Sequence, residues 1–186
     1  MFEGLFGMEP RTELNYKNDY ELLVAVILSA QCTDKRVNIV TPRLFERFPT
    51  INALADADLA ALTSLLSSVN FFNNKAKNII GMARMVRDEF NGMIPSELEK
   101  LIKLPGVGRK TASVFVAEFH KIPAVAVDTH VGRVARHFGW TQSTNPEIIE
   151  RDLKEIWDEK DWIRWHNYMV LYGRYYLRKR SPDLAS

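Results

Sequence analysis

Apolar residues recur along most of this chain at steps of three and four, the spacing of a helix with one buried face. Residues 145–157 (NPEIIERDLKEIW) show it most clearly, and their apolar stripe consists of Ile148, Ile149, Leu153, Ile156 and Trp157. Asn145 is a suitable N-cap, and Pro146 suits the first helical position, where its missing N–H costs nothing. We therefore expect an amphipathic helix that begins at residue 146.

Two further segments carry the same period. Residues 56–69 (DADLAALTSLLSSV) repeat leucine at positions 59, 62, 65 and 66. In residues 94–104 (IPSELEKLIKL), Ser96 and Glu99 have the spacing of a capping box ahead of an apolar run. No stretch alternates apolar and polar residues with hairpin turns between, so the expected fold class is all-α.

One segment interrupts the helical pattern. Residues 119–130 (FHKIPAVAVDTH) form an apolar run around Pro123, and this pattern alone would also permit a short strand. We expect the chain to pass here from one helical region to another.

Apolar runs and the single cysteine narrow the class of protein. The longest apolar run, Leu22–Ala30, is about half of the ~20 residues that a membrane span needs. The N-terminal segment lacks the basic region and apolar core of a secretory signal. Cys32 is the only cysteine, so neither an internal disulfide nor a cysteine-based metal site is expected. We expect an intracellular protein without a membrane partner, cytoplasmic and nucleoid-associated if the host is bacterial or archaeal.

Charge is unevenly distributed along the chain. The net charge is only +2, but residues 100–140 hold seven Lys or Arg and two acids, and so carry +5. Such a segment suits binding to a polyanion, and it equally suits a solvated basic surface. Charge alone leaves these two interpretations open.

Residues 104–115 (LPGVGRKTASVF) predict a tight corner between two helices. Pro105 is expected to end the first helix, and Gly106 and Gly108 to allow backbone angles closed to other residues. Such a corner presents backbone N–H groups beside a helix N-terminus, which is a phosphate site that reads no base. The alternative is an ordinary helix–helix turn, which the complete L-P-G-V-G-R string makes the less favoured interpretation.

This string resembles the helix-hairpin-helix motif of the DNA glycosylase superfamily, and more closely the endonuclease III family. The resemblance extends over nearly the whole chain and rests on ordered motifs: TELNY (12–16), ELLVAVILSAQCTD (21–34), NNKAKNI (73–79), LPGVGRKTA (104–112), AVDTHVGRV (126–134) and LYGRY (171–175). It implies two helical lobes with a DNA-binding cleft between them. One lobe would be a helical bundle of residues 12–122 that carries the hairpin, and the other would join residues 1–11 to 123–186.

The resemblance also implies the catalytic residues. Lys110 matches the lysine whose amine attacks C1′ of a damaged nucleotide, expels the base, and holds the sugar as a Schiff base before β-elimination. An amine needs a free electron pair for this attack, and the positive helix end, burial under DNA and Arg109 would all favour its neutral form. Asp128 matches a carboxylate that caps the next helix and stabilises positive charge on the sugar. Without the resemblance, Lys110 would be interpreted as a phosphate-binding or solvent-facing lysine.

Base removal further requires that the nucleotide leave the duplex. By resemblance, Gln31 fills the vacated space, and Phe71 is the apolar wedge between base steps. The family has a glycine before the wedge residue where this chain has Asn70, and because asparagine tolerates positive φ we expect the same turn there. The full set of implied DNA-binding residues is Gln31, Phe71, Leu104, Gly106, Val107, Gly108, Arg109, Thr111 and His130.

The C-terminal segment departs from the family. Relatives usually carry four cysteines that hold a [4Fe–4S] cluster, the first soon after the GRY motif, where this chain has Leu177. We therefore expect no cofactor and no metal. Arg174, Arg178, Lys179 and Arg180 are candidates to contact DNA phosphates in place of the cluster loop.

These features predict a base-excision-repair DNA N-glycosylase with AP-lyase activity that removes oxidised pyrimidines. The expected partner is double-stranded DNA with damaged bases or abasic sites, bound by a monomer. Two alternatives remain open: a glycosylase of the same superfamily for mismatched or otherwise altered bases with weak lyase activity, and a non-catalytic helix-hairpin-helix DNA-binding module.

Overall fold

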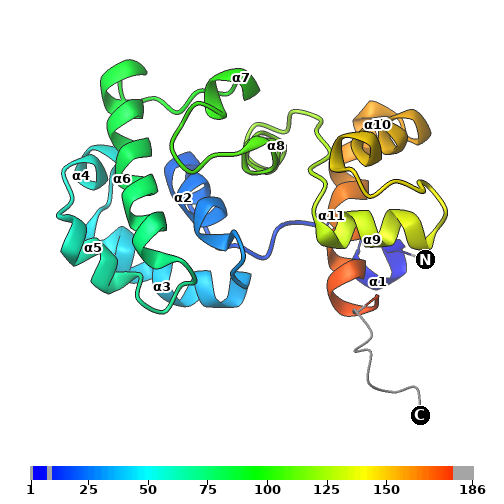
Figure 1. Cartoon of the computed structure of the whole chain (residues 1–186), viewed down its shortest axis with the longest axis horizontal. Coiled ribbons are helices and arrows are strands. Elements are labelled where there is room, and N and C mark those ends of the chain that lie inside the picture. The colour runs from blue at the N-terminus through cyan, green and yellow to red at the C-terminus, as the bar shows by residue number, and fades with distance from the viewer. Residues whose placement is uncertain (1, 8–9, 178–186) are drawn as a thin grey trace, which may run out of the picture. The chain divides into compact units, whose positions relative to one another are not determined.

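The computed structural model describes residues 2–7 and 10–177, and in these residues all regular structure is helical. The expected all-α fold class is therefore confirmed. The helices are α1 (Phe2–Phe6), α2 (Asp19–Ser29), α3 (Asp34–Arg47), α4 (Ile51–Ala55), α5 (Leu59–Leu65), α6 (Phe72–Glu89), α7 (Leu98–Leu101), α8 (Arg109–Glu118), α9 (Thr129–His137), α10 (Pro146–Ile156) and α11 (Trp162–Tyr175), with a 3-10 turn at Glu159–Asp161. Figure 1 shows them along the chain.

The chain divides into two compact units, Glu13–His120 and a discontinuous one of Met1–Thr12 with Lys121–Ser186. The unit Glu13–His120 is built around α2, whose residues Leu22–Leu28 are all buried. Helices α3, α6 and α8 all contact α2. A helix that is apolar on every side can be satisfied only in the middle of a bundle, and this explains the unbroken apolar run in the sequence.

The discontinuous unit has its core between α9, α10 and α11. Its buried residues are Val125, Val131, Val134, Ala135, Ile149, Leu153 and Met169. An aromatic layer joins the N-terminal helix to this core, because the ring of Phe2 lies 5.3 to 5.7 Å from those of Trp165, Tyr168 and Tyr172. The side chains of Asn167 and Tyr168 add hydrogen bonds to the backbone of Pro10 and Gly7. Residues 2–12 are thus part of the same unit as α11.

Local signals at helix ends had mixed outcomes. Asn145 caps α10 by accepting from the N–H of Glu147, and Pro146 is the first helical residue, both as expected. The capping box at Ser96 is wrong: α7 begins at Leu98, and its N-cap is Glu97, which makes no side-chain cap bond. Pro105 does not set the end of α7 either, because the helix already stops at Leu101. The apolar run at residues 121–128 is neither helix nor strand.

Candidate active site

The corner between α7 and α8 is held by buried side chains and by two backbone hydrogen bonds between residues close in sequence. The N–H of Leu104 donates to Leu101 O, and the N–H of Val107 donates to Leu104 O, each at 3.0 Å. Leu104 and Val107 are only 2% and 4% exposed, so any contact they make with DNA goes through their backbone groups. The apolar letters of the motif therefore anchor the corner, and its polar and glycine positions remain at the surface.

Only one of the two glycines needs its special freedom. Gly106 has φ +77°, in the left-handed region, whereas Gly108 has φ −86° and ψ 173°, which any residue can adopt. The expectation of unusual angles is thus correct for Gly106 and wrong for Gly108. A Cβ at Gly106 would also lie 2.9 Å from Cβ of Asn78 in α6. The corner is seated directly on α6, and Gly81 of the same helix allows the ring of Pro105 to approach.

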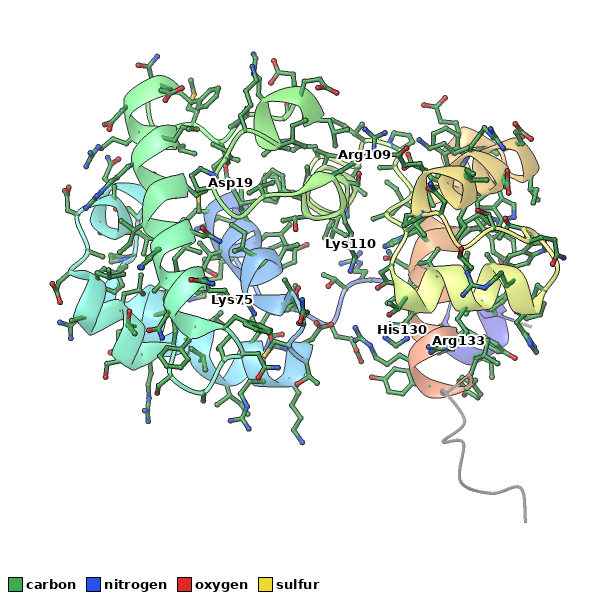
Figure 2. The ribbon with its side chains drawn as sticks, viewed as in Figure 1. Asp19, Lys75, Arg109, Lys110, His130 and Arg133 are labelled. Atoms are coloured by element: carbon green, nitrogen blue, oxygen red, sulfur yellow. The ribbon has the colours of Figure 1, made fainter. Side chains whose placement is uncertain are left out.

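Helix α8 begins immediately after this corner with Arg109 and Lys110. Its N-cap, Gly108, has no side chain to offer, so no side-chain cap bond is made there. Both basic residues are exposed, and Thr111 next to them is half-buried. Figure 2 shows the two basic side chains at the start of α8. Cations in a first turn oppose the helix dipole, so this arrangement does not favour the isolated helix and instead suits an anion bound at the helix end.

Asp128 is the N-cap of α9. Its Oδ1 accepts from the N–H of His130 and from the N–H of Val131, both at 2.8 Å. These bonds fix the carboxylate at the helix N-terminus, as the capping interpretation predicts.

His130, in the first turn of α9, contacts Arg133 of the same helix and packs closely against α11. Its Nδ1 lies 3.1 Å from Nη2 of Arg133, and the same guanidinium donates to the carbonyls of Gly173 and Leu177. An arginine can only donate, so Nδ1 of His130 is the acceptor in this contact. A Cβ at Gly173 would lie 2.8 Å from Cβ of His130, so this glycine is what permits the close approach of α11.

Gln31 and Phe71 both have a positive φ, of 53° and 57°. Phe71 is the N-cap of α6, and its side chain is 61% exposed. The left-handed turn expected at Asn70 is therefore one residue later, at Phe71. Asn70 instead donates from Nδ2 to Gln31 O at 2.7 Å, a bond that glycine cannot make. The two loops that carry Gln31 and Phe71 are thus hydrogen-bonded to each other.

Lys75 was missed by sequence reasoning. Only 6% of it is exposed, and its Nζ donates to Leu28 O at 2.8 Å and to Ala30 O at 2.6 Å. A signal for its burial was present, because Lys75, Ile79, Met82 and Val86 form one helical stripe and the other three are buried. Burial lowers the pKa of Lys75, and the neighbouring Cys32 acts in the opposite direction.

The predicted site residues fall in both units. Gln31, Phe71, the hairpin and Lys110 belong to Glu13–His120, whereas Asp128 and His130 belong to the discontinuous unit. Arg174 lies near the end of α11, and Arg178, Lys179 and Arg180 lie outside the described residues. No group of three or more His, Cys, Asp or Glu within residues 2–7 and 10–177 could hold a metal ion. The same residues include no helix that is long and apolar enough to span a membrane.

Leu177, at the position of the family's first cluster ligand, does not fit an iron–sulfur cluster. Leu177 packs against the core of the discontinuous unit, and its carbonyl accepts from Nε of Arg133 at 2.7 Å. Cys32, the only cysteine in the sequence, belongs to the other unit. Cluster ligation requires four thiolates or a close equivalent, and a leucine supplies no ligand.

The family model described as "HhH-GPD superfamily base excision DNA repair protein" matches residues 24–159, which include the hairpin, Lys110 and Asp128. The chain belongs to this superfamily. Among curated relatives, the endonuclease III of Synechocystis is 47% identical over 91% of this chain and 78% of its own length. That of Rickettsia felis is 44% identical over 94% and 82%, and that of Escherichia coli is 36% identical over 95% and 84%.

Solved structures agree with this placement in the HhH-GPD superfamily. A trapped covalent intermediate of an endonuclease III with DNA has a TM-score of 0.92 and 40% identity, and covers 98% of this chain and 85% of that one. A thermostable thymine-DNA glycosylase, at TM-score 0.80 and 18% identity, shares the fold. Together these relatives establish a DNA-binding base-excision-repair glycosylase with AP-lyase activity, and the interpretation as a non-catalytic module is set aside.

Proposed function

We propose that this glycosylase removes oxidised pyrimidines from double-stranded DNA, with Lys110 as the nucleophile and Asp128 as the carboxylate beside the sugar. The observation that carries the proposal is the position of Lys110, exposed in the first turn of α8 directly after the hairpin corner. Backbone groups of that corner would hold a phosphate, and the neighbouring amine would then lie close to the sugar of an everted nucleotide.

The proposed chemistry proceeds in two stages. Nζ of Lys110 forms a bond to C1′ while the bond from C1′ to the base breaks, and the base leaves with the electron pair and takes up a proton. Ring opening gives a Schiff base, loss of a C2′ proton then expels the 3′ phosphate, and hydrolysis frees the lysine. The carboxylate of Asp128 would stabilise positive charge as it develops on the sugar.

Borohydride trapping tests this assignment. Wild-type enzyme incubated with a duplex that contains an oxidised pyrimidine should become covalently attached to DNA, because borohydride reduces a Schiff base to a stable amine. Lys110→Gln should give no adduct, whereas Lys103→Gln, an exposed lysine on the other side of the corner, should trap normally. Equal trapping by wild type and Lys110→Gln would show that another group is the nucleophile.

The role of Asp128 can be separated from its cap. Asparagine is as good an N-cap as aspartate, so Asp128→Asn should keep the bonds to His130 and Val131 while it removes the charge. We expect unchanged stability and a base-release rate lower by about 100-fold, the loss typical for removal of one electrostatic group in a catalytic site. A panel of duplexes with oxidised, mismatched and alkylated bases then tests the preferred lesion.

The proposal also holds that this chain works without an iron–sulfur cluster, as a monomer inside the cell. The absence of a cluster is supported by Leu177 at the position of the first cluster ligand and by a single cysteine in the other unit. Purified protein that traps DNA should contain no stoichiometric iron and should lack the visible absorption of a cluster. Iron and sulfide bound in stoichiometric amounts would overturn this part, and gel filtration tests the monomer.

A further inference from the structure

Each of the last four carbonyls of α2, and that of its C-cap Ala30, has a hydrogen-bond partner. Val26 O accepts from the hydroxyl of Ser29, and the carbonyls of Ile27 and Ser29 accept from backbone N–H groups within the turn. Leu28 O and Ala30 O both accept from Nζ of Lys75. The last four carbonyls of a helix have no backbone N–H partner in its regular hydrogen-bond pattern. A buried ammonium at this end supplies such hydrogen bonds, and its positive charge is favoured by the helix dipole.

Gln31 follows this capped end directly, and its own carbonyl accepts from Asn70. Its φ of 53° is a conformation that a non-glycine residue keeps only where the surroundings impose it. Lys75 fixes the residue before Gln31 and Asn70 fixes Gln31 itself. The backbone of Gln31 is therefore held on both sides by groups that come from the loop and first turns of α6.

Phe71 depends on the same groups. It lies between Asn70 and α6, has φ of 57°, and its carbonyl accepts from the backbone N–H of Lys75 at 3.0 Å. Asn70 precedes Phe71 in the chain and bonds to Gln31, and Lys75 bonds to Phe71 through its backbone and to the end of α2 through its side chain. The same two residues therefore contact both turns. Helix α6 also seats the hairpin corner through Asn78 and Gly81, one and two turns further along.

We propose that Asn70 and Lys75 are positioning residues that hold Gln31 and Phe71 as one preformed unit for insertion into DNA. The inference rests on the proposed function, because it assumes that these two side chains probe the duplex. Figure 2 shows Lys75 between α6 and α2. Because Lys75 is buried and its Nζ donates to two backbone carbonyls, it would act on DNA through the residues it holds. Preformed geometry matters most for the step that extracts a paired, stacked base, because the inserting groups must replace the contacts that are lost.

The test compares two activities of the same enzyme. Base release from a lesion duplex requires extraction of a stacked base, whereas strand cleavage at a preformed abasic site does not. In single-turnover assays, Lys75→Met should lower base release by about 100-fold, the loss that a misplacement of about 1 Å can cause, and should change abasic-site cleavage by no more than about threefold. Lys77→Met, which removes an exposed lysine from the same helix, should change neither rate.

A second variant tests the inference even if Lys75→Met fails to fold. Asn70 is exposed, so Asn70→Ala removes its bond to Gln31 without leaving a cavity. It should reproduce the selective loss of base release, by about tenfold, because one of the two fixed points remains. In a Phe71→Ala background either substitution should have a smaller effect than alone, since residues that act as a unit are not additive.

The outcomes separate the inference from the function on which it rests. If Gln31→Ala and Phe71→Ala both release base at the wild-type rate, the proposed probing role is wrong. If those variants are impaired but Asn70→Ala and Lys75→Met are not, the positioning role is wrong. Parallel loss of base release and abasic-site cleavage would show that Lys75 only stabilises the fold, and would also overturn the proposal.

Discussion

Gly106→Ala is the substitution for which the structure gives the sharpest prediction. At φ +77° an alanine has the left-handed conformation, which costs an L-residue about 1–2 kcal/mol. The added Cβ would also lie 2.9 Å from Cβ of Asn78, a position fixed by the backbone of α6, and relief of such a contact costs about 1–3 kcal/mol. The free energy of unfolding should therefore fall by about 2–5 kcal/mol.

Two other glycines separate these contributions. Gly92 also has φ +77°, but no atom lies within 4 Å of an added Cβ, so Gly92→Ala should show only the conformational cost of about 1–2 kcal/mol. Gly108→Ala, with ordinary φ and open surroundings, should show only the cost of alanine at the N-cap of α8, about 0.5–1 kcal/mol. Urea denaturation of the three variants gives the comparison directly.

Affinity for DNA should also distinguish Gly106→Ala from Gly92→Ala. Gly106→Ala displaces the corner from α6, so its affinity for duplex DNA should fall, whereas Gly92→Ala, in the loop between α6 and α7 and outside the hairpin corner, should bind as wild type does. If Gly106→Ala costs no more stability than Gly92→Ala, the contact with Asn78 does not seat the corner, and the reasoning is refuted.

Two further predictions concern buried contacts. Tyr20 donates to Phe48 O at 2.7 Å, so Tyr20→Phe should lower the free energy of unfolding at pH 7 by about 1–3 kcal/mol. Burial, with a smaller contribution from Glu21, raises the pKa of Tyr20 far above its usual value. The unfolded chain therefore loses this proton near pH 10 while the folded chain keeps it, so the free energy of unfolding of the wild type should decline above about pH 10. In Tyr20→Phe this part of the decline should be absent when urea titrations are repeated across pH. Equal dependence of the free energy of unfolding on pH in the two proteins would contradict the prediction. Gly173→Ala should lower the free energy of unfolding by about 1–3 kcal/mol, because its Cβ would lie 2.8 Å from Cβ of His130. Gly4→Ala, at a helical glycine with open surroundings, should be neutral or stabilising in the same thermal or urea assay. No loss of stability in Gly173→Ala would mean that α9 and α11 move apart at little cost.

Periodicity and motif order predicted the helices and the hairpin because both depend on neighbours in sequence. The cap at Asn145 was predicted for the same reason, since the residues that make it are adjacent. Ser96 shows the limit of such local signals: its spacing suits a capping box, but α7 is only four residues long and begins two residues later. A helix that short is determined by the packing of Leu101 and not by its cap.

The contacts that sequence could not predict join residues far apart along the chain. Lys75 is separated from Leu28 by 47 residues, and Asn70 from Gln31 by 39. A lysine on an apolar stripe signals that something polar is buried nearby, but only the fold shows that the partners are the last carbonyls of α2. The left-handed turn was likewise expected at Asn70 and is found at Phe71, while the Asn70 side chain makes a long-range bond to Gln31 that sequence could not predict.

The discontinuity of the second unit has a consequence for synthesis on the ribosome. Everything that Glu13–His120 needs for its core is present once residue 120 has emerged, whereas Phe2 must wait for Trp165, Tyr168 and Tyr172 of α11. Contacts across such long stretches of chain form late, since the intervening loop must close first. The nascent protein therefore matures from its middle outwards, and the hairpin and Lys110 acquire their supports before the helix that bears Asp128 has any core to join.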